Sequence, residues 1–227
     1  TVPAYRNDVQ READIIEEIL RVYGYNNITI TEKLNASISS SSKFEDHKVQ
    51  NIVGNQLVSQ GFFEILANSL TTPAYTKLSL QLKEEHNVTI LNPLSNDLGV
   101  MRQSLLFSGL ESVSYNLNRK NNSLKFYEFG KTYHKMEEGY KENQHLQILV
   151  SGNVKAENWN TTSDKANYFF VKEKVEHILA RLGITKLKSE PISTHGFSDG
   201  LMYKFKKKRL VCFGKLDKKL CKAFGVK

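Results

Sequence analysis

Cysteine and long apolar runs are both scarce in this sequence of 227 residues. The only two cysteines, Cys212 and Cys221, lack metal-ligand spacing, and the six histidines form no HxxxH or HExxH pattern, which argues against a zinc site. No apolar stretch approaches the ~20 residues of a membrane span, and no signal-peptide pattern opens the chain. With 40% hydrophobic and 25% charged residues, the composition is that of an ordinary globular protein.

An initiator methionine is also missing, since the sequence begins Thr-Val-Pro. We therefore expect a piece of a longer protein. The serine-rich connector near residues 35–42 is the best candidate for a domain boundary. This pattern predicts that residues 1–40 are the end of a preceding domain with its connector, and that residues 41–227 form a second domain.

The net charge of +8 is concentrated near one end of the chain. Between Lys204 and Lys222 there are nine Lys or Arg residues and a single acid, Asp217. Such a tail has two interpretations, contact with nucleic-acid phosphates or lysine protection of exposed strand edges. The lack of an accompanying aromatic–basic stacking motif counts against a nucleic-acid-binding module.

The hydrophobic patterns predict a mixture of helices and strands. Helices are expected at about residues 9–23, 42–61, 74–80, 103–117 and 170–182, with a last helix starting at Asp217. Strands are expected at residues 62–70, 88–91, 124–133, 146–150, 186–190, 201–205 and 210–214. Strands joined by hairpins, with few helices between them, predict an α+β fold with a largely antiparallel sheet.

The first predicted helix is strongly acidic on one side. Asp14, Glu17 and Glu18 fall within an arc of about 100° on a helical projection. Asp8 stands just ahead of the helix, where an N-cap acceptor would lie. Four carboxylates near one helical edge suit a hard cation such as Mg²⁺. The alternative is a solvated acidic face in which Arg21 pairs with the glutamates at helical spacing.

Four segments of the sequence, the first of which contains the acidic helix, resemble segments of a known protein family. In order, they are VPAYRNDVQREADIIEEILRVYGYNNI, LVSQGFFEILANSL, NPLSNDLGVMRQSLLFSGLESVSYNLNRK and KFYEFGKTY. Together they resemble the β subunit of bacterial phenylalanyl-tRNA synthetase over most of residues 2–135. The resemblance implies a non-catalytic domain with a class II synthetase-like antiparallel sheet flanked by helices, preceded by the tail of another domain.

The same resemblance implies cofactors and partners. Family carboxylates that hold a Mg²⁺ shared with the α subunit map onto Asp8, Asp14, Glu17 and Glu18. The whole enzyme would join phenylalanine to tRNA(Phe) in the cytoplasm, as two α and two β chains, with ATP bound by the α subunit. The part played by this chain would be a scaffold and an α-facing interface.

Residues for independent catalysis are not expected in this chain. Class II synthetases bind ATP through an Arg on the motif 2 strand, and KFYEFGKTYHK resembles that strand with His134 and Lys135 in the Arg's place. Lysine does not reproduce the bidentate geometry of arginine. Arg102 has two interpretations, a phosphate contact or a structural pair with Asp97, and the family favours a structural role.

The second predicted helix resembles another part of class II synthetases. The helix at residues 42–61, the strand after it and Pro73 follow the layout of motif 1, which builds subunit interfaces. We therefore expect one face of this helix to be exposed here and covered by the α subunit.

Overall fold

The computed structural model describes residues 2–30, 32–33, 36, 45–79, 82–155, 158–160, 162–193 and 196–226. The chain divides into two compact units, an N-terminal unit of residues 1–44 and a C-terminal unit of residues 45–227. Each unit is described by itself. The predicted boundary between residues 40 and 41 lies outside the described residues and stays a prediction.

The N-terminal unit contains the acidic helix α1 (Glu12–Tyr23), followed by a short 3-10 helix, η1 (Tyr25–Asn27). The helix starts three residues later than the sequence predicted. The reason is local, because an Asp14 carboxylate oxygen accepts hydrogen bonds from the backbone N–H groups of Gln10 and Arg11, at 3.0 and 2.8 Å. The N-cap is therefore Arg11 and not Asp8 as predicted, and Asp14, at the third helical position, accepts from the N-cap N–H as in a capping box.

Two antiparallel ladders form most of the C-terminal unit. The first contains β1 (Phe63–Glu64), β5 (Leu124–Met136) and β6 (Gly139–Ser151), with β1 parallel to β5. The second contains β7 (Lys188–Ile192), β8 (Phe197–Phe205) and β9 (Lys208–Leu216). A small sheet joins β2 (Leu70–Thr71), β4 (Val100–Met101) and β3 (Val88–Thr89). The α+β prediction with mainly antiparallel pairing is confirmed.

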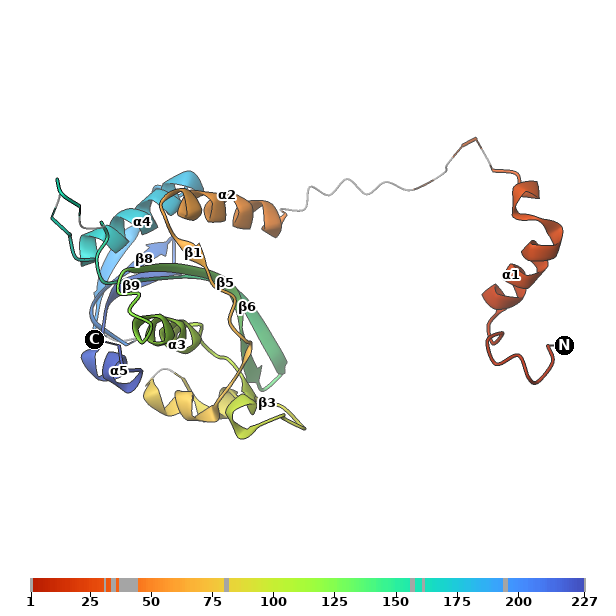
Figure 1. The fold of residues 1–227 in the computed structure, drawn as a ribbon, viewed down its shortest axis with the longest axis horizontal. Helices are drawn as coiled ribbons and strands as arrows, with labels where there is room; N and C mark the ends of the chain where they lie inside the picture. Colours follow the sequence, from red (N-terminus) through yellow and green to blue (C-terminus); the bar gives the residue numbers. More distant parts are fainter. Residues whose placement is uncertain are drawn as a thin grey trace. The chain divides into compact units, whose positions relative to one another are not determined.

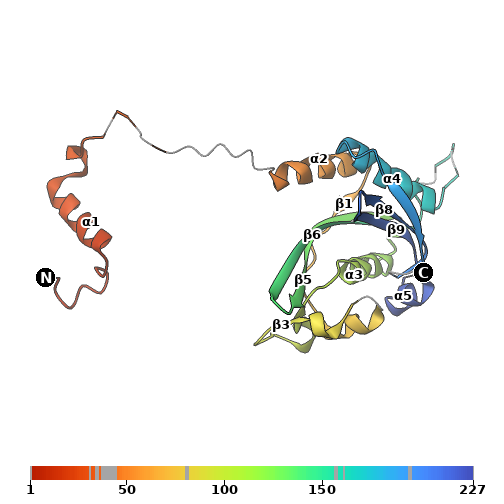
Figure 2. The same ribbon diagram turned by 180° about the vertical axis from the view of Figure 1, so that it is seen from behind.

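Helices cover both faces of these ladders (Figure 1). α2 (Asp46–Ser59) and α4 (Tyr168–Arg181) pack on one face, where Val53, Leu57 and Ile178 bury against Tyr127. α3 (Leu106–Leu117) lies on the concave face, with α5 (Lys218–Ala223) beside it (Figure 2). Short 3-10 turns complete the unit at η2 (Pro73–Leu78), η3 (Glu84–His86) and η4 (Asn96–Leu98). No helix in the described ranges has the length and apolarity needed to cross a membrane.

The predicted strand at residues 62–70 is wrong in its middle. Only its two ends are strands, β1 and the start of β2. Between them the backbone bends, because the Ala67 N–H approaches a carboxylate oxygen of Glu128 and the Ser69 carbonyl accepts from the Arg102 N–H at 2.8 Å. The chain is therefore shaped here by two residues distant in sequence.

Candidate functional site

The acidic helix gathers two of its predicted ligands around one cation, Arg6. Arg6 Nη2 lies 2.8 Å from Asp8 Oδ2 and 2.7 Å from Glu18 Oε1. Arg21 also contacts Glu18, with 3.2 Å between its Nη1 and Oε2 of Glu18. This contact is the one that the alternative of a solvated acidic face predicts. The Arg6 hydrogen bonds hold the pKa of Asp8 and that of Glu18 below their ordinary values, because they favour the charged carboxylates.

The other two predicted ligands have different surroundings. Asp14 is engaged with the backbone at the start of α1, and those N–H bonds lower its pKa. Glu17 is exposed on the helix surface. Within the part of the chain that the structure describes, no three His, Cys, Asp or Glu side chains form a metal-binding group. The oxygen donors of Asp8 and Glu18 nevertheless fit Mg²⁺ chemically, since both already contact a single cation.

Arg102 is a structural residue of the C-terminal unit. It is 4% exposed, and its Nη1 lies 2.7 Å from Oε1 of Glu128, which is 1% exposed. Its Nε also donates to the Lys131 carbonyl at 3.0 Å. The predicted pairing with Asp97 is wrong, because Glu128 on β5 provides the carboxylate instead. With Nε and Nη1 engaged inside the protein and the side chain buried, Arg102 is not placed to meet a phosphate.

Gly130 makes room for this ion pair. A Cβ at Gly130 would lie 2.4 Å from Arg102 Nη2 and 2.8 Å from Leu105 Cδ2, closer than van der Waals contact allows. Sequence reasoning missed Glu128 as the partner. The available signal was a charged residue in the middle of an apolar strand, KFYEFG, because a buried charge requires a partner.

The C-terminal half of β5 carries His134 and Lys135, which the family resemblance predicts at the position of the class II Arg. His134 is half-buried, and its ring centroid lies 6.4 Å from that of His86. Burial, and then the neighbouring His86, lower the pKa of His134, so a neutral imidazole is favoured at neutral pH. Lys135 is exposed. His195, in the HGFSDG loop, lies outside the described residues.

A cavity of about 1750 Å³ lies between β6 and β9, which form no ladder with each other in the described ranges. Its polar wall includes Thr132, His134 and His145, and Arg209 also lines it. A neutral imidazole cannot fix the negative charge of an adenylate as a paired guanidinium does. His134 therefore does not replace the positive charge of that Arg, although Arg209 is cationic elsewhere on the lining.

Large apolar side chains are exposed on α2, on β1 and just after β1. They are Ile52, Val58, Phe63 and Leu66. Phe63 is 70% exposed and Leu66 is 91% exposed, although Val53 and Leu57 on the same helix are buried. We call these four residues the α2–β1 face. The second helix therefore has exposed apolar side chains, while Val53 and Leu57 of its apolar stripe face the core, and coverage by the α subunit stays a prediction.

The basic residues between Lys204 and Lys222 do not form one surface. Lys206, Lys207 and Lys208 lie at the turn between β8 and β9, whereas Lys218, Lys219 and Lys222 belong to α5. The other eight residues of β9 lie between these groups, a length of roughly 26 Å at ~3.3 Å per residue. The tail is therefore two basic clusters.

Comparisons with known proteins agree over the whole chain. The profile described as "Phenylalanyl tRNA synthetase beta chain CLM domain" matches residues 30–227, and "tRNA synthetase B5 domain" matches residues 1–25. The Phenylalanine--tRNA ligase beta subunit of Bacteroides thetaiotaomicron is 44% identical over 99% of this chain. That of Desulfotalea psychrophila is 32% identical over 100% of it. The chain belongs to the phenylalanyl-tRNA synthetase β-chain family.

The comparisons also show how much of these relatives the chain covers and which kind of solved structure shares its fold. The chain spans 29% and 30% of the length of these two relatives. A solved pyrrolysyl-tRNA synthetase from Desulfitobacterium hafniense matches 80% of this chain and 62% of its own, with a TM-score of 0.60 and 15% identity. This likeness confirms the class II synthetase-like fold.

Proposed function

We propose that this chain is the β-side scaffold of a phenylalanine–tRNA ligase, in which an α subunit carries the active site. The complete enzyme would contain two α and two β chains and would use ATP and Mg²⁺ to join phenylalanine to tRNA(Phe). Membership of the β-chain family supports this role. The observation that carries the proposal is the α2–β1 face, which leaves four large apolar side chains in solvent.

The α2–β1 face would be the surface that the α subunit covers. Exposed apolar side chains gathered on neighbouring elements are typical of protein interfaces. Buried by a partner, each such side chain contributes about 1.5–3 kcal/mol. The side chains beside them, Val53 and Leu57, already pack into the core, so α2 would connect the interface directly to the fold.

A matched pair of double variants tests the interface. Phe63→Ser with Leu66→Ser should weaken binding of the chain to the α subunit at least tenfold, measured by calorimetry. Tyr140→Ser with Trp159→Ser removes equally exposed aromatic groups elsewhere and should leave the affinity unchanged. Equal affinities for the two double variants, at unchanged melting temperatures, would contradict the proposal.

The acidic helix would supply the β-side Mg²⁺ ligands. Asp8 and Glu18 would exchange their shared contact with Arg6 for the metal, and Asp14 and Glu17 would complete the carboxylate set. Mg²⁺ usually keeps several waters and takes only one or two carboxylates directly. Metal affinity should therefore be weak in this chain alone and greater beside the α subunit.

The chain alone would not activate phenylalanine. The Arg expected on the motif 2 strand is replaced by His134 and Lys135, and Arg102 is held by Glu128. Pyrophosphate exchange by the purified chain with ATP, Mg²⁺ and phenylalanine should equal a no-protein blank. Activity that persists through further purification would overturn the scaffold role.

A further inference from the structure

The turn between β8 and β9 presents three consecutive lysines to solvent. Lys206 adopts a left-handed backbone conformation with φ of 55°, which reverses the chain tightly between the two strands. Residues 205–210 are all exposed. The Lys206 ammonium lies 5.7 Å from the centroid of the Phe205 ring, so the aromatic ring helps to position it. We call Lys206, Lys207 and Lys208 the lysine turn.

The charge of the lysine turn is not balanced within the described chain. The neighbouring Lys204 is paired with Glu190 on β7, but no ion pair in the described ranges joins a carboxylate to any of the three turn lysines. Three adjacent ammonium groups repel one another, and a bound polyanion would relieve that repulsion. A turn of mixed charge would avoid this repulsion, so a turn of three lysines favours an anionic partner.

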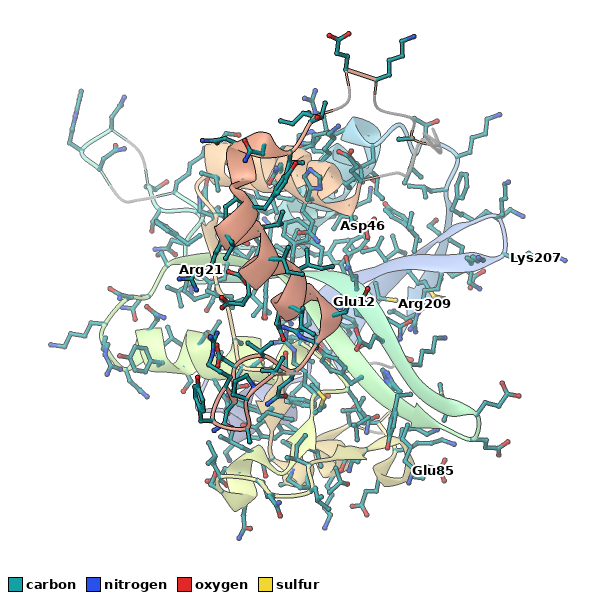
Figure 3. All side chains as sticks on the ribbon, turned by 90° about the vertical axis from the view of Figure 1, so that its right-hand side faces the viewer. Glu12, Arg21, Asp46, Glu85, Lys207 and Arg209 are labelled. Atoms are coloured by element: carbon teal, nitrogen blue, oxygen red, sulfur yellow. The ribbon has the colours of Figure 1, made fainter. Side chains whose placement is uncertain are left out.

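Protection of a strand edge does not explain Lys206 and Lys207, although Lys208 is the first residue of the edge strand β9. Edge protection places charges along the outer strands of a sheet, which here are β7 and β9, and Lys188 and Glu190 already give β7 charges of both signs. Lys206 and Lys207 instead lie at the end of the hairpin, where no strand can add. Figure 3 shows Lys207 at the outer end of this hairpin, pointing away from it, with Arg209 set further back.

Positive charge continues from the turn toward the neighbouring hairpin. The charge of Arg209 on β9 acts on His145 of β6 and contributes, after burial, to the lowered pKa of that histidine. Arg209 and His145 also line the same cavity, so the start of β9 faces β6 across it. A long anion laid across the lysine turn would remain close to Arg209 without meeting a carboxylate of the turn itself.

We propose that the lysine turn binds the phosphate backbone of RNA. Lysine ammonium groups on flexible stems bind phosphates as point charges and tolerate variation in their spacing. Phosphate contacts of this kind position a nucleic acid without reading its sequence. The choice of RNA over another polyanion rests on the proposed function, in which a tRNA is brought to the complex.

A salt series with two matched triple variants tests this binding. The tip variant combines Lys206→Asn with Lys207→Gln and Lys208→Gln, because asparagine tolerates the left-handed conformation at position 206. The control changes Lys218, Lys219 and Lys222 on α5 to Gln, which removes the same charge at the far end of β9. The probe is unfractionated tRNA, and the chain is titrated between about 50 and 200 mM salt.

The tip variant should reduce the slope of log K against log salt by about two to three, because each lysine removed loses one phosphate contact and the counterion release that accompanies it. Its affinity at about 100 mM salt should fall at least tenfold, whereas the α5 control should retain the wild-type slope. Equal decreases in both variants, or none in the tip variant, would overturn the proposal. If polyglutamate binds as tightly as tRNA and the tip variant weakens both equally, the surface is a site for acidic proteins and the RNA assignment is wrong.

This outcome is separable from that of the proposed function. The tip variant leaves the α2–β1 face intact and should bind the α subunit with wild-type affinity. Weaker α binding in the Phe63 and Leu66 double variant tests the scaffold role, whether or not RNA binds to the turn.

Discussion

The two units of this chain contain the same ion pair in two environments. Arg6 lies 2.7 Å from Glu18 in the N-terminal unit, and Arg102 lies 2.7 Å from Glu128 in the C-terminal unit. Solvent reaches the first pair, whereas the second is almost completely buried. Water screens an exposed pair and weakens its contribution to stability, but a buried charge that loses its partner is strongly destabilising.

The surroundings of the two pairs differ in the same way. Helix α1 has no buried residue, and its apolar residues Ile19 and Val22 are exposed. In the C-terminal unit, the pair lies among buried side chains and shapes the bend between β1 and β2. An exposed carboxylate is free to exchange one cation for another, while a buried one is committed to its partner. This contrast agrees with the ligand exchange proposed for the N-terminal pair, and it gives the C-terminal pair a structural role.

The largest effect should come from breaking the buried pair. Glu128→Gln preserves size but leaves Arg102 without a counter-charge, so the free energy of unfolding of the C-terminal unit should fall by about 3–5 kcal/mol. Glu142→Gln is the matched control, because Glu142 forms an exposed pair with Lys131 on the same hairpin. Urea denaturation measures both. A Glu128 variant as stable as the Glu142 control would show that the buried pair does not support the fold.

The second effect concerns Mg²⁺ and not stability. Glu17→Gln with Glu18→Gln removes two charges while keeping side-chain size and helix propensity. In the enzyme assembled from α and β subunits, this change should raise the Mg²⁺ concentration for half-maximal aminoacylation at least threefold. Glu12→Gln with Glu32→Gln removes the same charge from exposed positions and should have no effect. An unchanged Mg²⁺ dependence in the Glu17 and Glu18 variant would leave the acidic face as a solvated surface.

The smallest effect should be the pH dependence of His134. Its pKa is lowered in the folded protein from an ordinary value of 6.5, because burial disfavours the imidazolium. The unfolded chain therefore binds a proton first, and stability is lost as the pH falls below about 6.5. His134→Gln should reduce the loss of unfolding free energy between pH 7 and pH 5. Parallel pH profiles for wild type and variant would mean that His134 titrates normally.

Local patterns predicted the elements well where the residues themselves determine them. The apolar stripe at residues 170–182 predicted α4 to within two residues, and Asp217 begins the last helix as a cap. The strand at residues 210–214 was correct but short, because pairing with β8 extends it by two residues at each end. Helical spacing also predicted the Arg21–Glu18 contact.

Long-range contacts account for what the patterns missed. The bend within residues 62–70 depends on Glu128, more than 50 residues away, and β-propensity contains no sign of that contact. The Mg²⁺ ligands can be recognised as residue types but not as an assembled site, because Asp14 is engaged by the backbone and Asp8 by Arg6. Two charged residues inside apolar segments, Arg102 and Glu128, were the signal for the buried pair.

Hydrogen exchange of the chain, alone and with the α subunit, tests most directly whether the chain is a scaffold with an α-facing surface. Backbone amides of residues 45–70, which include the α2–β1 face, should exchange more slowly once the α subunit is bound. Amides of the lysine turn should exchange at the same rate in both samples and serve as the internal control. Added protection within residues 45–70 is the predicted result, and its absence at saturating α subunit would contradict the account.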